Sequence, residues 1–270
     1  MNKKFDNPAR YFLATYIASY FFWIISAIVS RQPAGEISFI LFLIPGMMAP
    51  TFAAIWMIRK DRTGDLWASF KNRIFNLRLI QWPRFLASLL IVPAAILVAT
   101  AISVVFGGDP AQFQLADGFS FSIGMAPTFL ILILTATFEE LGWRGYGMES
   151  LHSKYSYFKA SIIFGVLWAC WHLPLFFISG LYQYEIANES ILYAINFVLS
   201  IIPMAVIINW VYQINKKSIT AIILFHLFIN LSQEALNITQ NTKCIESIVL
   251  AIFAVIVVLL NRSMFFDKEN

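Results

Sequence analysis

Glu139, Glu140 and Arg144 follow a long apolar run that closes at Phe138, in the stretch Glu-Glu-Leu-Gly-Trp-Arg. Ionisable side chains in or beside hydrocarbon are costly, so they need partners and commonly mark a functional site. Glu140 and Arg144 are four residues apart and can pair on one face of a helix. Glu139 lies about 100° away around the same helix. The spacing therefore predicts that the arginine holds one glutamate while the other is available for chemistry.

Three further polar side chains lie within apolar runs. Trp168 and His172 are four residues apart, as are His226 and Asn230, so each pair shares one face of a helix. Taken singly, Glu140 and Arg144 fit a salt bridge at a helix end, and the histidines and the asparagine fit hydrogen bonds inside the bundle, although hydrogen bonds between helices average only about 0.6 kcal/mol in membranes. Their occurrence together on separate runs instead predicts one shared polar cavity.

The composition indicates where these side chains are buried. The 270 residues are 59% hydrophobic and only 13% charged, with a mean hydropathy of +0.72, whereas a soluble domain has about 25% charged residues. The sequence therefore predicts an all-α integral membrane protein, because alternating strands of a barrel are absent. The net charge of +4 indicates membrane orientation rather than a nucleic-acid partner. Cys170 and Cys244 form neither a CxxC pair nor a metal-binding spacing.

The apolar runs predict a bundle of about eight transmembrane helices in a single domain over residues 1–270. The first run is too long for a cleavable signal peptide. Pro45 and Pro50 interrupt the second run, so neighbouring helices must satisfy the backbone groups that they free. The eight expected spans are Tyr11–Ser30, Ile37–Ile58, Phe85–Phe106, Phe119–Phe138, Ala160–Ile178, Ile191–Tyr212, Ser218–Leu236 and Ile245–Leu260.

Basic residues predict the orientation of this bundle. With both termini in the cytoplasm, 17 of the 19 lysines and arginines fall on the cytoplasmic side, and only Arg31 and Lys243 fall outside. A bacterial plasma membrane fits this bias. Because the fourth span ends inside, we expect the polar cavity to open to the cytoplasm. Glu139 reaches the histidines only if its helix is tilted or continues past Glu140 towards Tyr146.

Residues 61–84 form a basic segment between the second and third spans. We expect Asp65 to cap a helix there whose apolar and basic side chains lie on different faces. Such a helix is typical of one that rests on an anionic leaflet, and an ordinary basic loop is the alternative. The apolar face would hold Leu66, Phe70, Ile74 and Leu77, and the basic side chains are Lys71, Arg73 and Arg78.

The three motifs, in this order and on separate spans, resemble a known family. EExxxR at 139–144, an aromatic-xxx-His at 168–172 and HxxxN at 226–230 are similar to the CAAX protease and bacteriocin-processing family, also called CPBP or Abi. This family of intramembrane glutamate endopeptidases includes the Rce1-type prenyl-protein endopeptidases. The resemblance covers about residues 120–235. Trp168 stands where the family usually has phenylalanine, which changes one wall of the substrate pocket.

The resemblance implies an intramembrane endopeptidase. Glu139 and His172 would activate a water molecule, and His226 and Asn230 would stabilise the oxyanion. Glu140 and Arg144 would support Glu139. No cofactor is expected, although Glu139, His172 and His226 also have the residue types of a zinc site with an open position.

The substrate would be a membrane-associated peptide or protein, such as a lipidated C-terminus or a precursor leader. Membrane lipids are the other expected partners. A non-proteolytic immunity or partner-binding protein with the same fold is the main alternative. A transporter is the third, because buried glutamate and histidine also form proton relays. The absence of a visible inverted repeat speaks against it.

Overall fold

The computed structural model describes residues 5, 7–32, 38–116 and 128–267. Regular structure in these residues is helical, apart from one isolated β-bridge between Leu115 and Leu236. The helices are α1 Pro8–Val29, α3 Ile40–Arg59, α4 Asp65–Phe75, η1 Leu77–Leu79, α5 Trp82–Leu89, α6 Ile91–Val105, η2 Pro110–Phe113, α7 Thr128–Gly142, η3 Trp143–Gly147, α8 Met148–His152, α9 Tyr157–Trp171, η4 Leu173–Phe177, α10 Tyr182–Glu189, α11 Ile191–Ile214, α12 Ile219–Gln233, α13 Gln240–Leu260 and α14 Arg262–Phe266.

Six of the eight expected spans are helices that are long and apolar enough to cross a membrane. They are α1, α3, α5 with α6, α9 with η4, α11 and α13. The seventh expected span is α12, which is apolar but has only 15 residues. The expected span Phe119–Phe138 begins outside the described residues, and α7 covers its second part from Thr128. The all-helical membrane fold is therefore confirmed, with six helices of spanning length among the described residues, and the count of eight is not confirmed.

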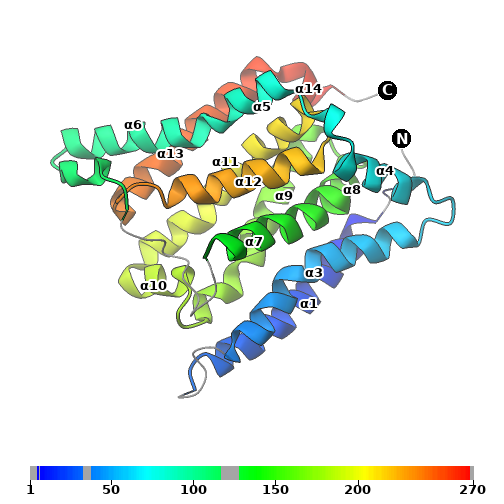
Figure 1. Cartoon of the computed structure of the whole chain (residues 1–270), viewed down its shortest axis with the longest axis horizontal. Coiled ribbons are helices and arrows are strands. Elements are labelled where there is room, and N and C mark those ends of the chain that lie inside the picture. The colour runs from blue at the N-terminus through cyan, green and yellow to red at the C-terminus, as the bar shows by residue number, and fades with distance from the viewer. Residues whose placement is uncertain (1–4, 6, 33–37, 117–127, 268–270) are drawn as a thin grey trace.

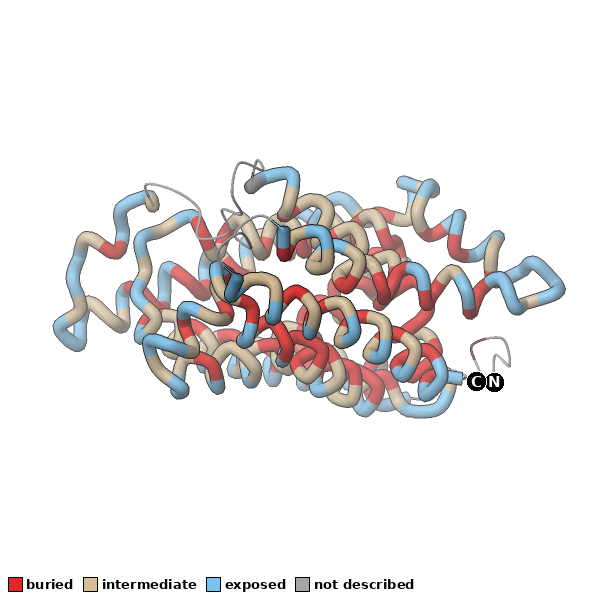
Figure 2. The backbone as a smooth tube through the Cα atoms, turned by 90° about the horizontal axis from the view of Figure 1, so that it is seen from below, coloured by how far each residue is buried: buried red, intermediate tan, exposed pale blue. Residues whose placement is uncertain are grey.

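The long helices lie side by side, with buried residues along the middle of the molecule and exposed residues outside (Figures 1 and 2). α4, α14 and the start of α1 lie at one end, which we call the terminal side, and α10 lies at the opposite end (Figure 1). Pro50 lies within α3 and leaves the carbonyl of Gly46 without its helical partner. The Ser19 hydroxyl on α1 donates to that carbonyl at 2.8 Å. A neighbouring helix thus satisfies the backbone freed by a proline, as predicted.

The basic segment does form a short helix, α4, but its faces differ from the prediction. Gly64, with φ of 75°, is the N-cap, and Asp65 is the first helical residue rather than the cap. Leu66 and Phe70 are buried as expected. Leu77 lies beyond the end of α4 and is 54% exposed, because the chain turns into a 3₁₀ helix there.

Candidate active site

The helix that carries the glutamates runs on beyond them, as the sequence predicted. After α7 the chain continues through η3, which is a π-helix, and then α8. Gly142 lies at the junction, and a Cβ atom there would lie 2.4 Å from the backbone of Pro50. Glycine therefore lets α7 pack directly on α3. A π-turn changes the facing of the residues around it and is frequent at functional sites.

Arg73 of α4 holds this π-turn from the side. Its guanidinium donates to the carbonyls of Arg144 and Gly145, at 2.8 and 2.9 Å, and to the Tyr212 hydroxyl at 2.7 Å. The wider spacing of a π-turn leaves carbonyls without regular partners, and Arg73 supplies donors for two of them. We expected Arg73 among the cations outside the apolar face, and that prediction is wrong because the side chain is buried.

The Glu140 carboxylate links its own helix, α7, to η3 and to α12 through two side-chain contacts. One carboxylate oxygen accepts from Arg144 at 2.8 Å, which confirms the predicted pair, and the other contacts Nδ1 of His226 at 2.7 Å. Arg144 also donates to Asn209 of α11 at 3.0 Å. Glu140 and Arg144 are fully buried. The pair therefore contacts His226, whereas the sequence reasoning assigned its support to Glu139.

Glu139 is held by two tryptophans. Its Oε2 atom accepts from the indole of Trp168 at 2.7 Å and from that of Trp143 at 3.2 Å. The residue is only 3% exposed. Trp168 thus contacts the glutamate as well as the cavity, a role that the sequence reasoning missed. Trp143 comes four residues after Glu139, so the spacing could have predicted that its indole N–H donates to this carboxylate.

The two histidines differ in the partner of Nδ1. In His172, Nδ1 lies 2.8 Å from the carbonyl of Trp168, which can only accept, so Nδ1 carries the proton. In His226, Nδ1 faces the carboxylate of Glu140. In both rings Nε2 is therefore the nitrogen left for a ligand, because the bond at one nitrogen sets the role of the other.

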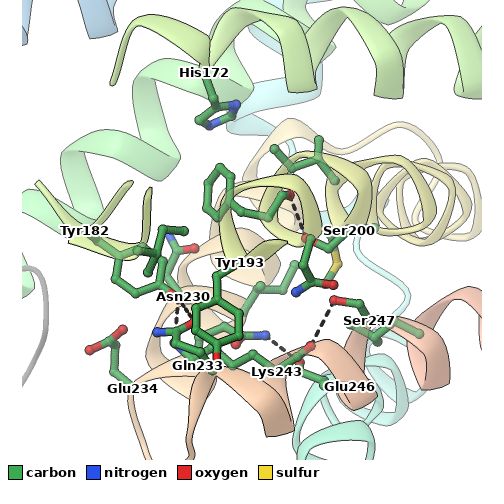
Figure 3. Close-up of a pocket in the computed structure, with 18 of the residues that line it drawn as sticks. His172, Tyr182, Tyr193, Ser200, Asn230, Gln233, Glu234, Lys243, Glu246 and Ser247 are labelled. Atoms are coloured by element: carbon green, nitrogen blue, oxygen red, sulfur yellow. Dashed lines mark hydrogen bonds between the residues drawn. The ribbon is translucent and has the colours of Figure 1, made fainter. Parts of the chain in front are cut away.

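One pocket brings four of the predicted residues together. Trp168, His172, His226 and Asn230 all line a cavity of about 180 Å³ among α9, α10, α11, α12 and α13. Figure 3 shows His172 at one end of it. Glu139, Glu140 and Arg144 do not line this pocket. Glu139 lies one side chain behind its wall, bonded to the Trp168 indole.

The far end of the pocket carries polar residues that sequence reasoning did not select. Gln233, Glu234, Lys243 and Glu246 line it (Figure 3). Glu246 is 2% exposed and lies inside the last expected span. Its place in an apolar run is the same signal that selected Glu139, so the sequence could have identified it.

The pocket lies in the half of the bundle away from the termini. Its lining comes from the end of α9, α10, α11 as far as Ile208, the second half of α12 and the first half of α13. On the terminal side, η3 and α8 follow the glutamates along the chain. Arg73 donates to two backbone carbonyls of η3 there. Which face of the membrane this half meets is not fixed by the lining residues, so the opening of the cavity to the cytoplasm stays a prediction.

The described residues contain no group of three or more His, Cys, Asp or Glu side chains arranged to hold a metal ion. The zinc ligands considered from the sequence, Glu139, His172 and His226, are thus not gathered in that way. Their nearest polar partners are instead tryptophan indoles, a backbone carbonyl and Glu140.

A polar pocket with two histidines and an asparagine, inside an all-helical membrane bundle, fits the class of membrane-embedded hydrolases. The family model described as type II CAAX prenyl endopeptidase Rce1-like matches residues 121–232. The chain is also 47% identical over 262 residues to CAAX prenyl protease 2 of Methanococcus maripaludis, with 97% of each chain covered. This chain therefore belongs to the Rce1-like CAAX prenyl endopeptidase family.

Proposed function

We propose that this protein is an intramembrane endopeptidase in which a glutamate and a histidine activate water. The observation that carries the proposal is that two histidines line one pocket and have different partners at Nδ1. His172 is bonded through Nδ1 to a neutral carbonyl, and His226 is bonded through Nδ1 to a carboxylate. One ring is therefore suited to accept a proton or a hydrogen bond, and the other to donate.

His172 and Glu139 would act on the water. With its proton on Nδ1, the neutral His172 ring presents an Nε2 lone pair to the pocket and accepts a hydrogen bond from the water. The two indoles hold Oε2 of Glu139, and Oε1 has no hydrogen-bond partner among the described residues. A small displacement of the Trp168 indole would bring this carboxylate to the same water. General-base catalysis of this kind typically contributes 10²–10⁴-fold in rate.

His226 and Asn230 would stabilise the tetrahedral intermediate. A His226 ring with protons on both nitrogens would donate from Nδ1 to the Glu140 carboxylate and from Nε2 to the oxyanion. Asn230 is one helical turn further along α12 and lines the same pocket. One oxyanion donor is commonly worth about 10²–10³ in kcat. Collapse of the intermediate would break the C–N bond and return the proton taken from water to the leaving amine. This route uses protein side chains alone, and we propose that it needs no metal.

The substrate is proposed to be a membrane-associated peptide or protein. The Methanococcus relative is named a CAAX prenyl protease, which favours a substrate with a prenyl group near its carboxyl terminus. Apolar side chains of α11 that line the pocket, including Ile201, Met204 and Ile208, give a lipid-bearing peptide an apolar wall.

The 17-to-2 distribution of basic residues favours cytoplasmic termini in a plasma membrane. The lining residues of the pocket would then lie mostly in the half of the bundle away from the cytoplasm. Two variants, Lys154→Cys and Asn241→Cys, test this orientation. Both positions are exposed, and they lie at opposite ends of the bundle. Labelling of intact cells by an impermeant maleimide should reach position 241 and not 154, in a chain whose two native cysteines have been replaced. The reverse pattern would put the pocket on the cytoplasmic side.

Comparative peptidomics of membranes tests the activity. Membranes that carry the wild type should contain cleavage products that are absent with Glu139→Gln. Glu149→Gln is a matched control, because this carboxylate pairs with Lys217 away from the pocket. Products that persist with both Glu139→Gln and His226→Ala would refute the peptidase. If these variants also keep the cellular phenotype, the partner-binding alternative is favoured.

A further inference from the structure

Lys243 is the only lysine or arginine among the described residues that line the pocket. It lies near the start of α13, at the end of the pocket opposite His172 (Figure 3). Its Nζ donates to the Tyr182 hydroxyl at 3.2 Å and lies 4.7 Å from the centre of that ring. Tyr182 in turn donates to Gln240 at 3.0 Å. The ammonium is therefore positioned by a second helix, α10, rather than extending freely into solvent.

The hydrogen bond and ring contact of Lys243 orient its charge without forming an ion pair, and Glu246 acts on that charge only from beyond ion-pair distance. The ring and the hydroxyl of Tyr182 are uncharged, and within the described chain no carboxylate lies within 4.0 Å of Nζ. An ammonium has three N–H donors, and the Tyr182 hydroxyl uses one of them. A positioned cation with remaining donors at a pocket wall is suited to bind an anionic group of a ligand.

Two acidic residues limit where such an anion can lie. Glu246 is one turn deeper on α13, is 2% exposed and accepts from Gln233 at 2.5 Å. Glu234 also lines the pocket. A ligand anion beside either carboxylate would be repelled, and the repulsion is stronger in an apolar surrounding than in water. Lys243 is therefore the favourable position for an anion along this wall.

The spacing from the histidines indicates which anion fits. His226 and Gln233 are seven residues apart on α12, a rise of about 10 Å. The hydrogen bond between Gln233 and Glu246 joins α12 to α13 at that depth. Lys243 is three residues before Glu246 on α13, which puts its backbone about 4.5 Å nearer the end of the bundle. The lysine side chain can reach back over part of this length. Three or four extended residues, at about 3.4 Å each, span the remaining 10–14 Å.

We propose that Lys243 binds the C-terminal carboxylate of the substrate, three or four residues after the cleaved bond. This specificity role rests on the proposed peptidase function. It would make the protein select free chain ends, because an internal sequence or an amidated end has no carboxylate for Lys243. A charge-assisted hydrogen bond of this type corresponds to roughly a tenfold to hundredfold preference.

The test compares two prenylated peptides that differ only in a free or an amidated C-terminus, with purified protein in zwitterionic bicelles. The wild type should cleave the free acid with a kcat/KM about tenfold to a hundredfold higher. Lys243→Met should bring the ratio of acid to amide close to one, and Lys243→Arg should keep a clear preference. Lys154→Met, an exposed lysine far from the pocket, should keep the wild-type ratio.

Each outcome decides a separate point. Equal cleavage of acid and amide by the wild type, or an unchanged ratio in Lys243→Met, overturns the carboxylate site but leaves the peptidase standing. Cleavage of neither peptide overturns the peptidase as well. Bicelles with anionic phospholipid test a lipid phosphate as the bound anion. If anionic lipid changes the wild-type rate equally for both peptides, and Lys243→Met abolishes that change, Lys243 binds lipid rather than substrate. A series with two to six residues after the cleaved bond should show its optimum at three or four.

Discussion

The adjacent glutamates Glu139 and Glu140 should fail in different ways when each is changed to glutamine. Both substitutions keep the side-chain volume and remove one negative charge. Glu140 contacts Arg144 and His226, whereas Glu139 contacts two neutral indoles. Loss of the charge therefore leaves a buried guanidinium without its counterion in one case only. We expect Glu140→Gln to damage stability first and Glu139→Gln to damage catalysis first.

The magnitudes follow from these contacts. Breaking a buried ion pair by removing one partner typically costs about 3–5 kcal/mol. For a chain of this size each kcal/mol lowers Tm by about 2–4 °C, so Glu140→Gln should unfold about 6–20 °C earlier. In Glu139→Gln the amide oxygen still accepts from an indole, and the change in unfolding free energy should stay below about 2 kcal/mol. Its peptidase rate should nevertheless fall by about 10²–10⁴.

The assay follows tryptophan fluorescence during heating in one detergent, with peptide cleavage measured on the same samples. Glu189→Gln is the control, because this carboxylate is exposed and substitutions at exposed positions usually change stability by less than about 0.5 kcal/mol. Adding Arg144→Met to Glu140→Gln should recover part of the lost stability, since no unpaired guanidinium remains. Equal Tm shifts for Glu139→Gln and Glu140→Gln, or strictly additive effects in the double variant, would refute the assignment of the two carboxylates.

Three more outcomes are expected. Arg73→Met removes the guanidinium donors to the carbonyls of Arg144 and Gly145, and only Arg144 keeps a second donor, the Tyr212 hydroxyl. It should cost about 2–5 kcal/mol in thermal unfolding, whereas exposed Lys71→Met should cost less than about 0.5. Burial favours a raised pKa for the Glu149 carboxyl, but Lys217 and Arg73 together lower it below 4.5. The contacts of the ionised Glu149 with Lys217 and Arg73 therefore stabilise the fold fully above about pH 4.5. Glu149→Gln should reduce the loss of stability on acidification. A chelator should leave the peptide cleavage rate within about twofold, and loss restored only by zinc would contradict the metal-independent route.

Features that depend on one helix at a time could be predicted from the sequence. The apolar runs gave most helices within a few residues, because hydrocarbon requires a minimum apolar length. The Glu140–Arg144 pair follows from a spacing of four along one helix. The continuation of the glutamate helix followed from the reach that Glu139 needs.

Features that depend on how helices rotate and tilt could not be predicted. Nothing in the spacing of His226 and Asn230 shows that Nδ1 of the histidine meets Glu140, 86 residues earlier. The π-turn at Trp143–Gly147 and the buried Arg73 that holds it depend on contacts among α3, α4 and α7. A helical-wheel argument placed Arg73 outside because it treated α4 as packed on lipid alone.

The position of the pocket is another feature that depends on contacts between helices and could not be predicted from spacing along one helix. Counting residues from the ends of spans put the glutamates near the terminal side, and the cavity was expected to open there. The π-turn and α8 follow the glutamates on that side, while the lining of the pocket comes mostly from the other half, where α10 and the start of α13 carry its polar end. Glu140 lies at the boundary, with Arg144 towards the closed side and His226 towards the pocket. One buried carboxylate thus binds Arg144 in the π-turn and also places a negative charge beside His226 at the pocket. These two contacts give a reason for a membrane protein to keep an ion pair in its centre.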